Sequence, residues 1–292
     1  LASAIRNRRS RPEVRYQDEI TKMLFDDHPR TRPITADDVQ AIEMQDVFRI
    51  YRERFADPGG FTYVFVGNVD PEKLKEYAST YIGGLPAGRD ESRQDRGVTF
   101  TDSTQQKDVF AGKEDKSRVT LIFTGEYTWS LENNHALSSL ASMLQIRLRE
   151  KIREEEGGTY SVGVSSSVNR FPAEEYAMWI SFSCDPERVG DLVSIVDSEL
   201  ESVLEGNVEG KNAEKVRELQ VSDFEKAKER NSYWLGVLGS SYRYGLPVER
   251  ILAREERING IDRAMLADTA GRFLGDAVRL EAVLYPEDAQ AR

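Results

Sequence analysis

Two polar side chains flank one short turn in the stretch LREKIREEEGGTYSVGVSSS, which covers residues 148–167. Arg153 precedes the glycine pair Gly157–Gly158, and Tyr160 follows it. A guanidinium and a phenol that converge can both donate hydrogen bonds to one carbonyl oxygen, and can stabilise the oxyanion that forms when this carbonyl is attacked. The residue types alone favour a simpler interpretation, with Arg153 as a surface residue at a helix end and Tyr160 as an ordinary strand residue.

No other motif in the sequence predicts catalysis. The two histidines, His28 and His135, are more than 100 positions apart, and the sequence has no His-x-x-Glu-His motif in either order. A histidine-based zinc site therefore cannot be built from a local motif of this chain. Phosphate-binding loops, dinucleotide-binding glycine fingerprints and the Gly-x-Ser-x-Gly nucleophile turn are missing from the sequence as well.

The elements that would hold Arg153 and Tyr160 are a long helix and a hairpin. Apolar residues recur every three or four positions ahead of Arg153, which is the spacing of an amphipathic helix. They are Leu137, Leu140, Leu144, Leu148 and Ile152. The glycine pair supplies the left-handed cap that ends such a helix. Apolar and small polar residues then alternate over 160–168 and again over 176–184, which predicts an antiparallel hairpin.

The rest of the chain predicts further helices around strands. Residues 11–27 have a helical spacing, and a second helix begins after Thr35, a plausible N-cap. FTYVFVG, residues 61–67, is apolar enough to be a central strand, and a helix follows that starts at Pro71. RLEAVLYPE, near the end of the chain, predicts a final strand. Residues 231–244 form a helix whose aromatic residues, Trp234 and Tyr242 among them, either pack in a core or line a binding chamber.

One block of elements occurs twice. ITADD leads into a helix, the strand FTYVFVG and NVDPE; INGID leads into a helix, the strand RLEAVLY and PED. We therefore expect the back part of one module in residues 1–88 and nearly all of a second in residues 107–292. The polar residues 89–106 between them have no periodicity and are expected to be a linker. The expected fold class is α+β.

Composition limits the partners. The 292 residues include 40 basic and 51 acidic ones, for a net charge of -11, which argues against a nucleic acid or an anionic membrane surface as the main partner. No apolar run approaches the roughly 20 residues that span a bilayer. The one cysteine, Cys184, excludes an internal disulfide and is expected to be a small buried apolar residue.

Three segments together resemble the C-terminal, non-zinc half of zinc peptidases of the pitrilysin/insulinase family. In that family a helix that ends in Leu-Arg-x-x-x-Arg-x-x-x-Gly-x-x-Tyr runs into a strand, as residues 148–160 do here. Residues 34–86 resemble the family's module ending, with Gly-x-Val-Asp-Pro-Glu after a strand. NSYWLGVLGSSYRYG, residues 231–245, resembles bacterial pitrilysin-like zinc proteases. The resemblance covers most of residues 30–287.

The resemblance implies tandem α+β modules, each with a mostly antiparallel sheet and helices on one face. It implies that this half binds peptide in a closed two-half chamber, where Arg153 and Tyr160 reach the scissile carbonyl. Trp234 and Tyr242 would then line the chamber. Zinc and its general base would lie in the missing N-terminal half, so no catalytic or metal-ligating residue is expected in this chain.

Three hypotheses stay open at this point. The chain is the substrate-binding half of a zinc metalloendopeptidase, a structural subunit with the same fold, or a silent subunit that pairs with a zinc-bearing chain. A His-x-x-Glu-His motif several hundred residues upstream in the same reading frame would favour the first, and a start codon shortly before Leu1 the third. The chain begins LASAIRNRRS, which has no initiator Met and no targeting pattern, and is expected to be a piece of a larger polypeptide. The peptide substrate cannot be inferred, and a periplasmic location is suggested only by the resemblance.

Overall fold

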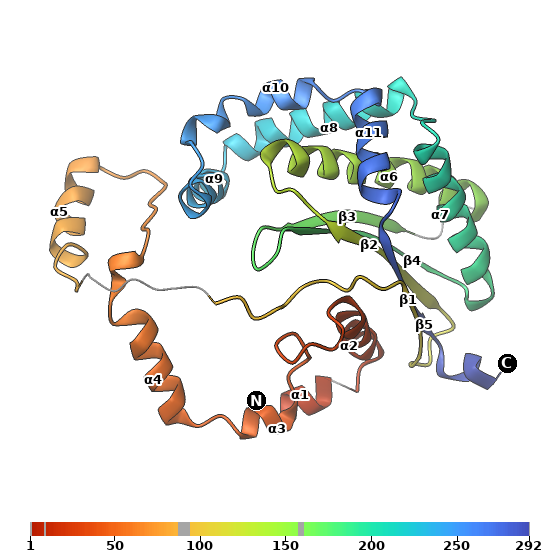
Figure 1. The fold of residues 1–292 in the computed structure, drawn as a ribbon, viewed down its shortest axis with the longest axis horizontal. Coiled ribbons are helices and arrows are strands. Elements are labelled where there is room, and N and C mark those ends of the chain that lie inside the picture. The colour runs from red at the N-terminus through yellow and green to blue at the C-terminus, as the bar shows by residue number, and fades with distance from the viewer. Residues whose placement is uncertain (1, 9, 87–93, 157–160, 292) are drawn as a thin grey trace. The chain divides into compact units, whose positions relative to one another are not determined.

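The structure is a computed structural model that describes residues 2–8, 10–86, 94–156 and 161–291 (Figure 1). The chain divides into two compact units, and each is made of separated segments. The first unit comprises Leu1–Val39, Asp95–Arg217 and Gly260–Arg292. The second unit comprises Gln40–Gln94 and Glu218–Asn259.

The first unit contains a five-stranded sheet with the strand order β1-β5-β2-β4-β3. Its strands are β1 (Gln105–Phe110), β2 (Ser117–Glu126), β3 (Val162–Asn169), β4 (Glu175–Cys184) and β5 (Val278–Tyr285). The β1–β5 pair is parallel and every other pair is antiparallel. The predicted hairpin is confirmed as β3–β4, with Val164 opposite Ile180, and Cys184 is buried as expected.

Three helices cover one face of this sheet. They are α6 (Leu131–Glu156), α7 (Val189–Leu204) and α11 (Arg263–Leu274), which pack against one another and against the strands. Val119 and Leu121 of β2 are fully buried, as are the leucines of the predicted stripe on α6. The sequence-based expectation of an α+β fold with a mostly antiparallel sheet is therefore confirmed.

The opposite face of the sheet carries a helix too. Helix α2 (Pro12–Leu24) follows the short α1 (Ala2–Arg8), and Figure 1 shows it across the sheet from α6. Its Tyr16 and Ile20 pack on Ile122, and the Tyr16 hydroxyl donates to the carbonyl oxygen of Ala282 over 2.8 Å. Burial raises the pKa of the Tyr16 hydroxyl well above its ordinary value, although the charge of Arg118 partly opposes the shift.

The second unit is mostly helical. Its helices are α4 (Met44–Phe55), α5 (Pro71–Tyr81), α9 (Asn231–Tyr244), α10 (Arg254–Asn259) and the end of α8 (Gly210–Lys228), while α3 (Ala36–Gln40) crosses the boundary between units. The second unit also has 3-10 turns at Pro58–Gly60 and Val248–Ile251, while those at Pro186–Arg188 and Glu287–Ala291 belong to the first unit. The predicted start of α5 is confirmed: the Asp70 carboxylate accepts from the amides of Glu72 and Lys73, which caps the helix before Pro71.

The strand predicted at FTYVFVG is wrong for this structure. Residues 61–66 have an irregular backbone, and the side chains of Phe61, Tyr63 and Phe65 are exposed. A strand needs a neighbour for its backbone N–H and C=O groups, and in the described part of the chain every strand belongs to the sheet of the first unit. The apolar composition of the segment suits a strand, but pairing requires a neighbouring strand that the described residues do not supply.

The compact units do not follow the predicted boundaries at residues 88 and 107. Helix α2 lies in the predicted first module, yet its apolar face belongs to the core of the sheet. Strand β1 begins at Gln105, within the predicted linker, because the register with β5 starts there. The modules were inferred from a repeat in the sequence, and the units from contacts in the structure, so the two divisions need not coincide. The modules stay a prediction.

Candidate functional site

Arg153 lies in the last turn of α6, and its side chain is exposed. Tyr160 lies outside the described residues, and the chain is described again from Ser161, directly before β3. The structure therefore describes the long helix that precedes residues 157–160 and the edge strand that follows them. Arg153 and Tyr160 as a converging pair stay a prediction.

Helix α6 and strand β3 are joined by one side chain that the sequence analysis did not single out. The amide of Gln145 donates through Nε2 to the carbonyl oxygen of Val162 over 2.8 Å. Its Oε1 accepts from the backbone N–H of Val164 over 2.6 Å. β3 pairs only with β4, so these two groups lie on its open edge. One side-chain amide thus pairs two backbone groups on the edge of β3, and it fixes the beginning of this strand on the helix that carries Arg153.

A second arginine on α6 has the opposite environment from Arg153. The Nε of Arg147 forms an ion pair with Glu199 of α7, and its Nη1 donates to the carbonyl oxygen of Asn207 over 2.6 Å. The side chain of Arg147 is 13% exposed, and that of Glu199 is 7% exposed. A buried charge is tolerated when it is paired and hydrogen-bonded, and this pair fixes α6 against α7. The signal for it in the sequence is weak: Arg147 adjoins the apolar stripe at Leu144 and Leu148.

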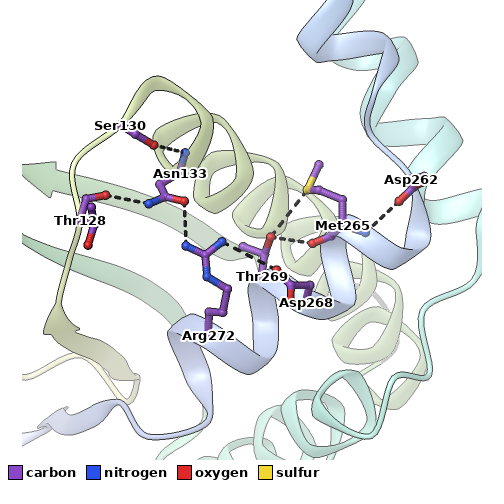
Figure 2. Close-up of polar contacts among 8 residues, drawn as sticks. All are labelled: Thr128, Ser130, Asn133, Asp262, Met265, Asp268, Thr269 and Arg272. Atoms are coloured by element: carbon purple, nitrogen blue, oxygen red, sulfur yellow. Dashed lines mark hydrogen bonds and ion pairs between the residues drawn. The ribbon is translucent and has the colours of Figure 1, made fainter.

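The N-terminus of α6 is fixed by α11 (Figure 2). Ser130 caps the helix by accepting from the amide of Asn133 over 2.9 Å, and the Asn133 side chain donates to the carbonyl oxygen of Thr128. Arg272 of α11 donates to Oδ1 of Asn133 over 2.7 Å and lies 3.7 Å from Asp268. Figure 2 shows these side chains converging between the two helices. Arg272 thereby holds the beginning of α6 against α11, while Arg153, near the other end of the helix, is exposed.

Trp234 and Tyr242, the two aromatic residues considered for a chamber lining, both lie on α9 in the second unit. Trp234 is half-buried, and its indole N–H donates to the carbonyl oxygen of Lys228 over 2.8 Å. Tyr242 is 63% exposed. Tyr242 is therefore no core residue of this unit, and a role in substrate contact stays a prediction for both.

The described residues do not fit a zinc ion. Among them, no three His, Cys, Asp or Glu side chains lie together as a ligand set. Nδ1 of His28 accepts from the backbone N–H of Arg30. His135 lies on α6, more than 100 positions further along the chain. Within the described ranges, no helix is long and apolar enough to cross a membrane.

A family comparison gives the class of protein. The model of the peptidase M16 inactive domain matches residues 41–219, which is more than half of the chain and includes Arg153 and Tyr160. The chain belongs to the peptidase M16 inactive-domain family. The resemblance to the zinc-less half of such peptidases is thereby confirmed.

Individual relatives agree with this family. A zinc protease PQQL-like protein of Arabidopsis thaliana is 26% identical over 258 residues, which are 82% of this chain and 27% of the plant protein. The crystal structure of the periplasmic protease PqqL from Escherichia coli superposes with a TM-score of 0.83 at 19% identity, over 98% of this chain and 32% of that one. A peptidase M16 inactive domain from Pseudomonas fluorescens superposes with a TM-score of 0.77 at 16% identity. The superposition covers 98% of this chain and 68% of the Pseudomonas chain. The chain thus spans about a quarter to a third of the first two proteins.

Proposed function

We propose that this chain is the substrate-binding, zinc-less half of a zinc-dependent metalloendopeptidase that encloses peptides between two halves. Arg153 and Tyr160 would donate hydrogen bonds to the oxygen of the scissile carbonyl. The observation that carries this proposal is the exposed Arg153 at the end of a helix that is otherwise fixed by its core, by Gln145 and by Arg147. Donors that are already held in place stabilise a developing oxyanion without reorganisation.

The contrast between the two arginines supports this role. The charge of Arg147 is used within the fold, where Glu199 neutralises it. Arg153 lies less than two helical turns further along, where the same residue type contributes exposed positive charge. In a chain of net charge -11, a cation at a rigid helix end offers a local site for a carbonyl or carboxylate oxygen.

Zinc and the general base would come from elsewhere. The described residues contain no zinc ligand set, so a zinc-bearing N-terminal half of the same polypeptide, or a zinc-bearing partner chain, would have to supply both. The residues of this chain would then bind and orient the peptide. A periplasmic location is part of the proposal, and its support is the likeness to a protease described as periplasmic.

The test uses the full-length protein. It should contain one zinc per complete polypeptide or per pair of chains by elemental analysis, and should cleave members of an unstructured peptide library. A chelator should abolish this cleavage, and added zinc should restore it. A full-length protein that carries no zinc and cleaves no peptide, alone or with a co-purifying zinc-bearing chain, would contradict the proposal and favour a structural subunit.

A further inference from the structure

Strand β1 lies at one edge of the sheet, and β3 lies at the other. The inner side of β1 pairs in parallel with β5, and the hydrogen bond from the Ala111 N–H to the Tyr285 carbonyl oxygen continues this ladder. Because backbone groups alternate along a strand, the N–H and C=O groups of Gln106, Asp108 and Phe110 point away from β5. In the described part of the chain no strand pairs with this side of β1, so it can accept an added strand.

A cavity of about 590 Å³ lies between β1 and α2. The charged residues that line it are Arg15, Asp18, Glu19, Lys22, Lys107 and Asp108. Asp18 lies 4.0 Å from Arg8, and an ion pair of 2.6 Å joins Glu19 to Lys22. Arg15 and Lys107 have no ion-pair partner among the described residues. These two cations favour an acidic side chain as the occupant of this cavity.

A second cavity, of about 330 Å³, lies on the opposite face of β1. Val109 packs in the core under α2, so the side chains of Asp108 and Phe110 point away from α2. The ring of Phe110 stacks on Tyr285 with centroids 5.4 Å apart, and the carboxylates of Asp108 and Glu187 line the same cavity. Burial raises the pKa of the Asp108 carboxyl, and within the described ranges no cation pairs with either carboxylate.

This second cavity has the chemistry that binds a Lys or Arg side chain. Stacked aromatic rings can hold the apolar stem of such a side chain, and a carboxylate can bind its charged end. The two cavities therefore favour opposite charges on the two faces of one open strand. Successive side chains of an extended peptide also point to opposite faces, so a peptide that pairs with β1 can fill both cavities with neighbouring residues.

We propose that the open edge of β1 binds an extended segment of a partner protein in which an acidic residue adjoins a basic one. The segment adds a strand to the sheet through the outward backbone groups of β1. Its acidic side chain reaches Arg15 and Lys107, and its basic side chain packs on Tyr285 beside Asp108. This edge is the one opposite to β3, so the site is separate from the role proposed for Arg153 and does not depend on it.

The experiment uses the full-length protein and two peptides of identical composition with blocked ends. In Thr-Val-Glu-Arg-Val-Thr the charged residues are adjacent and point to opposite faces, whereas in Thr-Glu-Val-Arg-Val-Thr they point to the same face. In calorimetry the first peptide should bind once per chain, at least about tenfold more tightly than the second. Equal affinities, no binding of the first peptide, or its cleavage as a substrate would each overturn the proposal.

Hydrogen exchange resolved to single residues tests where the peptide binds. At saturating peptide, the amides of Gln106, Asp108 and Phe110 should exchange at least about tenfold more slowly, because they gain backbone partners. The amides of Lys107 and Val109 face β5 already, so their exchange should not change. Binding without slower exchange at the three outward amides would contradict strand addition.

Charge reversal tests the assigned side chains. Asp108→Lys should weaken the first peptide at least about tenfold, and should prefer Thr-Val-Glu-Glu-Val-Thr, in which Glu replaces Arg. Glu114→Lys makes the same charge change at an exposed position between β1 and β2, and should leave both affinities unchanged. Equal effects of the two substitutions would contradict the site. A dimer of this chain that the peptide dissociates would instead assign the edge to a second copy and overturn the proposal.

Discussion

The side chain of Gln145 replaces a neighbouring strand for Val162: its amide donates to the Val162 carbonyl oxygen over 2.8 Å and accepts from the next outward-facing N–H, that of Val164. An edge strand with open backbone groups is otherwise a template for pairing with another chain. This contact blocks the beginning of β3 and ties it to α6. One neutral side chain therefore links the helix that carries Arg153 to the strand that begins shortly after Tyr160.

Replacing this amide tests how much it stabilises the contact between α6 and β3. Gln145→Ala should destabilise the protein by about 1–2 kcal/mol, because two backbone groups lose a partner at a partly buried position. Gln145→Glu should retain acceptance from Val164 N–H but lose donation to the Val162 carbonyl oxygen, so the Val164 amide should stay protected from hydrogen exchange although the protein is destabilised. Ser138→Ala, at an exposed position of α6, is the control. Unchanged exchange at Val164 in Gln145→Ala would contradict the role given to this residue.

The buried pair of Arg147 and Glu199 should matter more for stability than any exposed pair. Arg147→Ala leaves the Glu199 carboxylate buried without its partner, and should cost about 3 kcal/mol of unfolding free energy. Replacing both residues together, with Met and Leu, should cost less than the single substitution, because no charge is then left unpaired. Arg188→Ala, which removes an exposed pair with Asp191, should cost less than about 1 kcal/mol in the same denaturant titration.

The cap at Thr35 gives a prediction for pH. The Asp38 carboxylate accepts from the amide and hydroxyl of Thr35, and these hydrogen bonds, with that of Arg32, lower its pKa to about 2. A lowered pKa in the folded state means that the cap contributes above the ordinary Asp pKa, near 4, and is lost as the pH falls toward 2. Protection of the Thr35 amide, measured as its exchange rate relative to the intrinsic rate at each pH, should therefore fall over this window. Asp38→Asn should remove the pH dependence, whereas Asp37→Asn should keep it; a titration of Asp38 near pH 4 would contradict the cap.

The repeated block shows what the sequence can and cannot predict. RLEAVLY and FTYVFVG have the same apolar character, and both were predicted as strands. The first is β5, because β1 and β2 pair with it, and the second is irregular, because the described residues give it no neighbour. Local composition determines whether a segment can be a strand, while pairing depends on residues far away in the chain.

The candidate site divides in the same way. The stripe on α6 and the β3–β4 hairpin follow from periodicity and are confirmed, whereas the predicted cap at Gly157–Gly158 lies outside the described residues. Gln145 and Arg147 were missed, since a polar residue on a long helix looks the same in sequence whether it faces solvent, a strand edge or a carboxylate on α7. Only the packing of α6 against β3 and α7 distinguishes them.

Peptide turnover by the full-length protein tests most directly whether Arg153 and Tyr160 bind the scissile carbonyl. Arg153→Ala and Tyr160→Phe should each lower kcat by on the order of 10²–10³, the usual effect of removing one oxyanion donor, with folding and zinc content unchanged. Lys151→Ala is the matched control: it removes an exposed cation from the same turn of α6, on the opposite side of the helix, and should leave kcat unchanged. Wild-type turnover in both Arg153→Ala and Tyr160→Phe would contradict the account and return Arg153 to an ordinary surface residue.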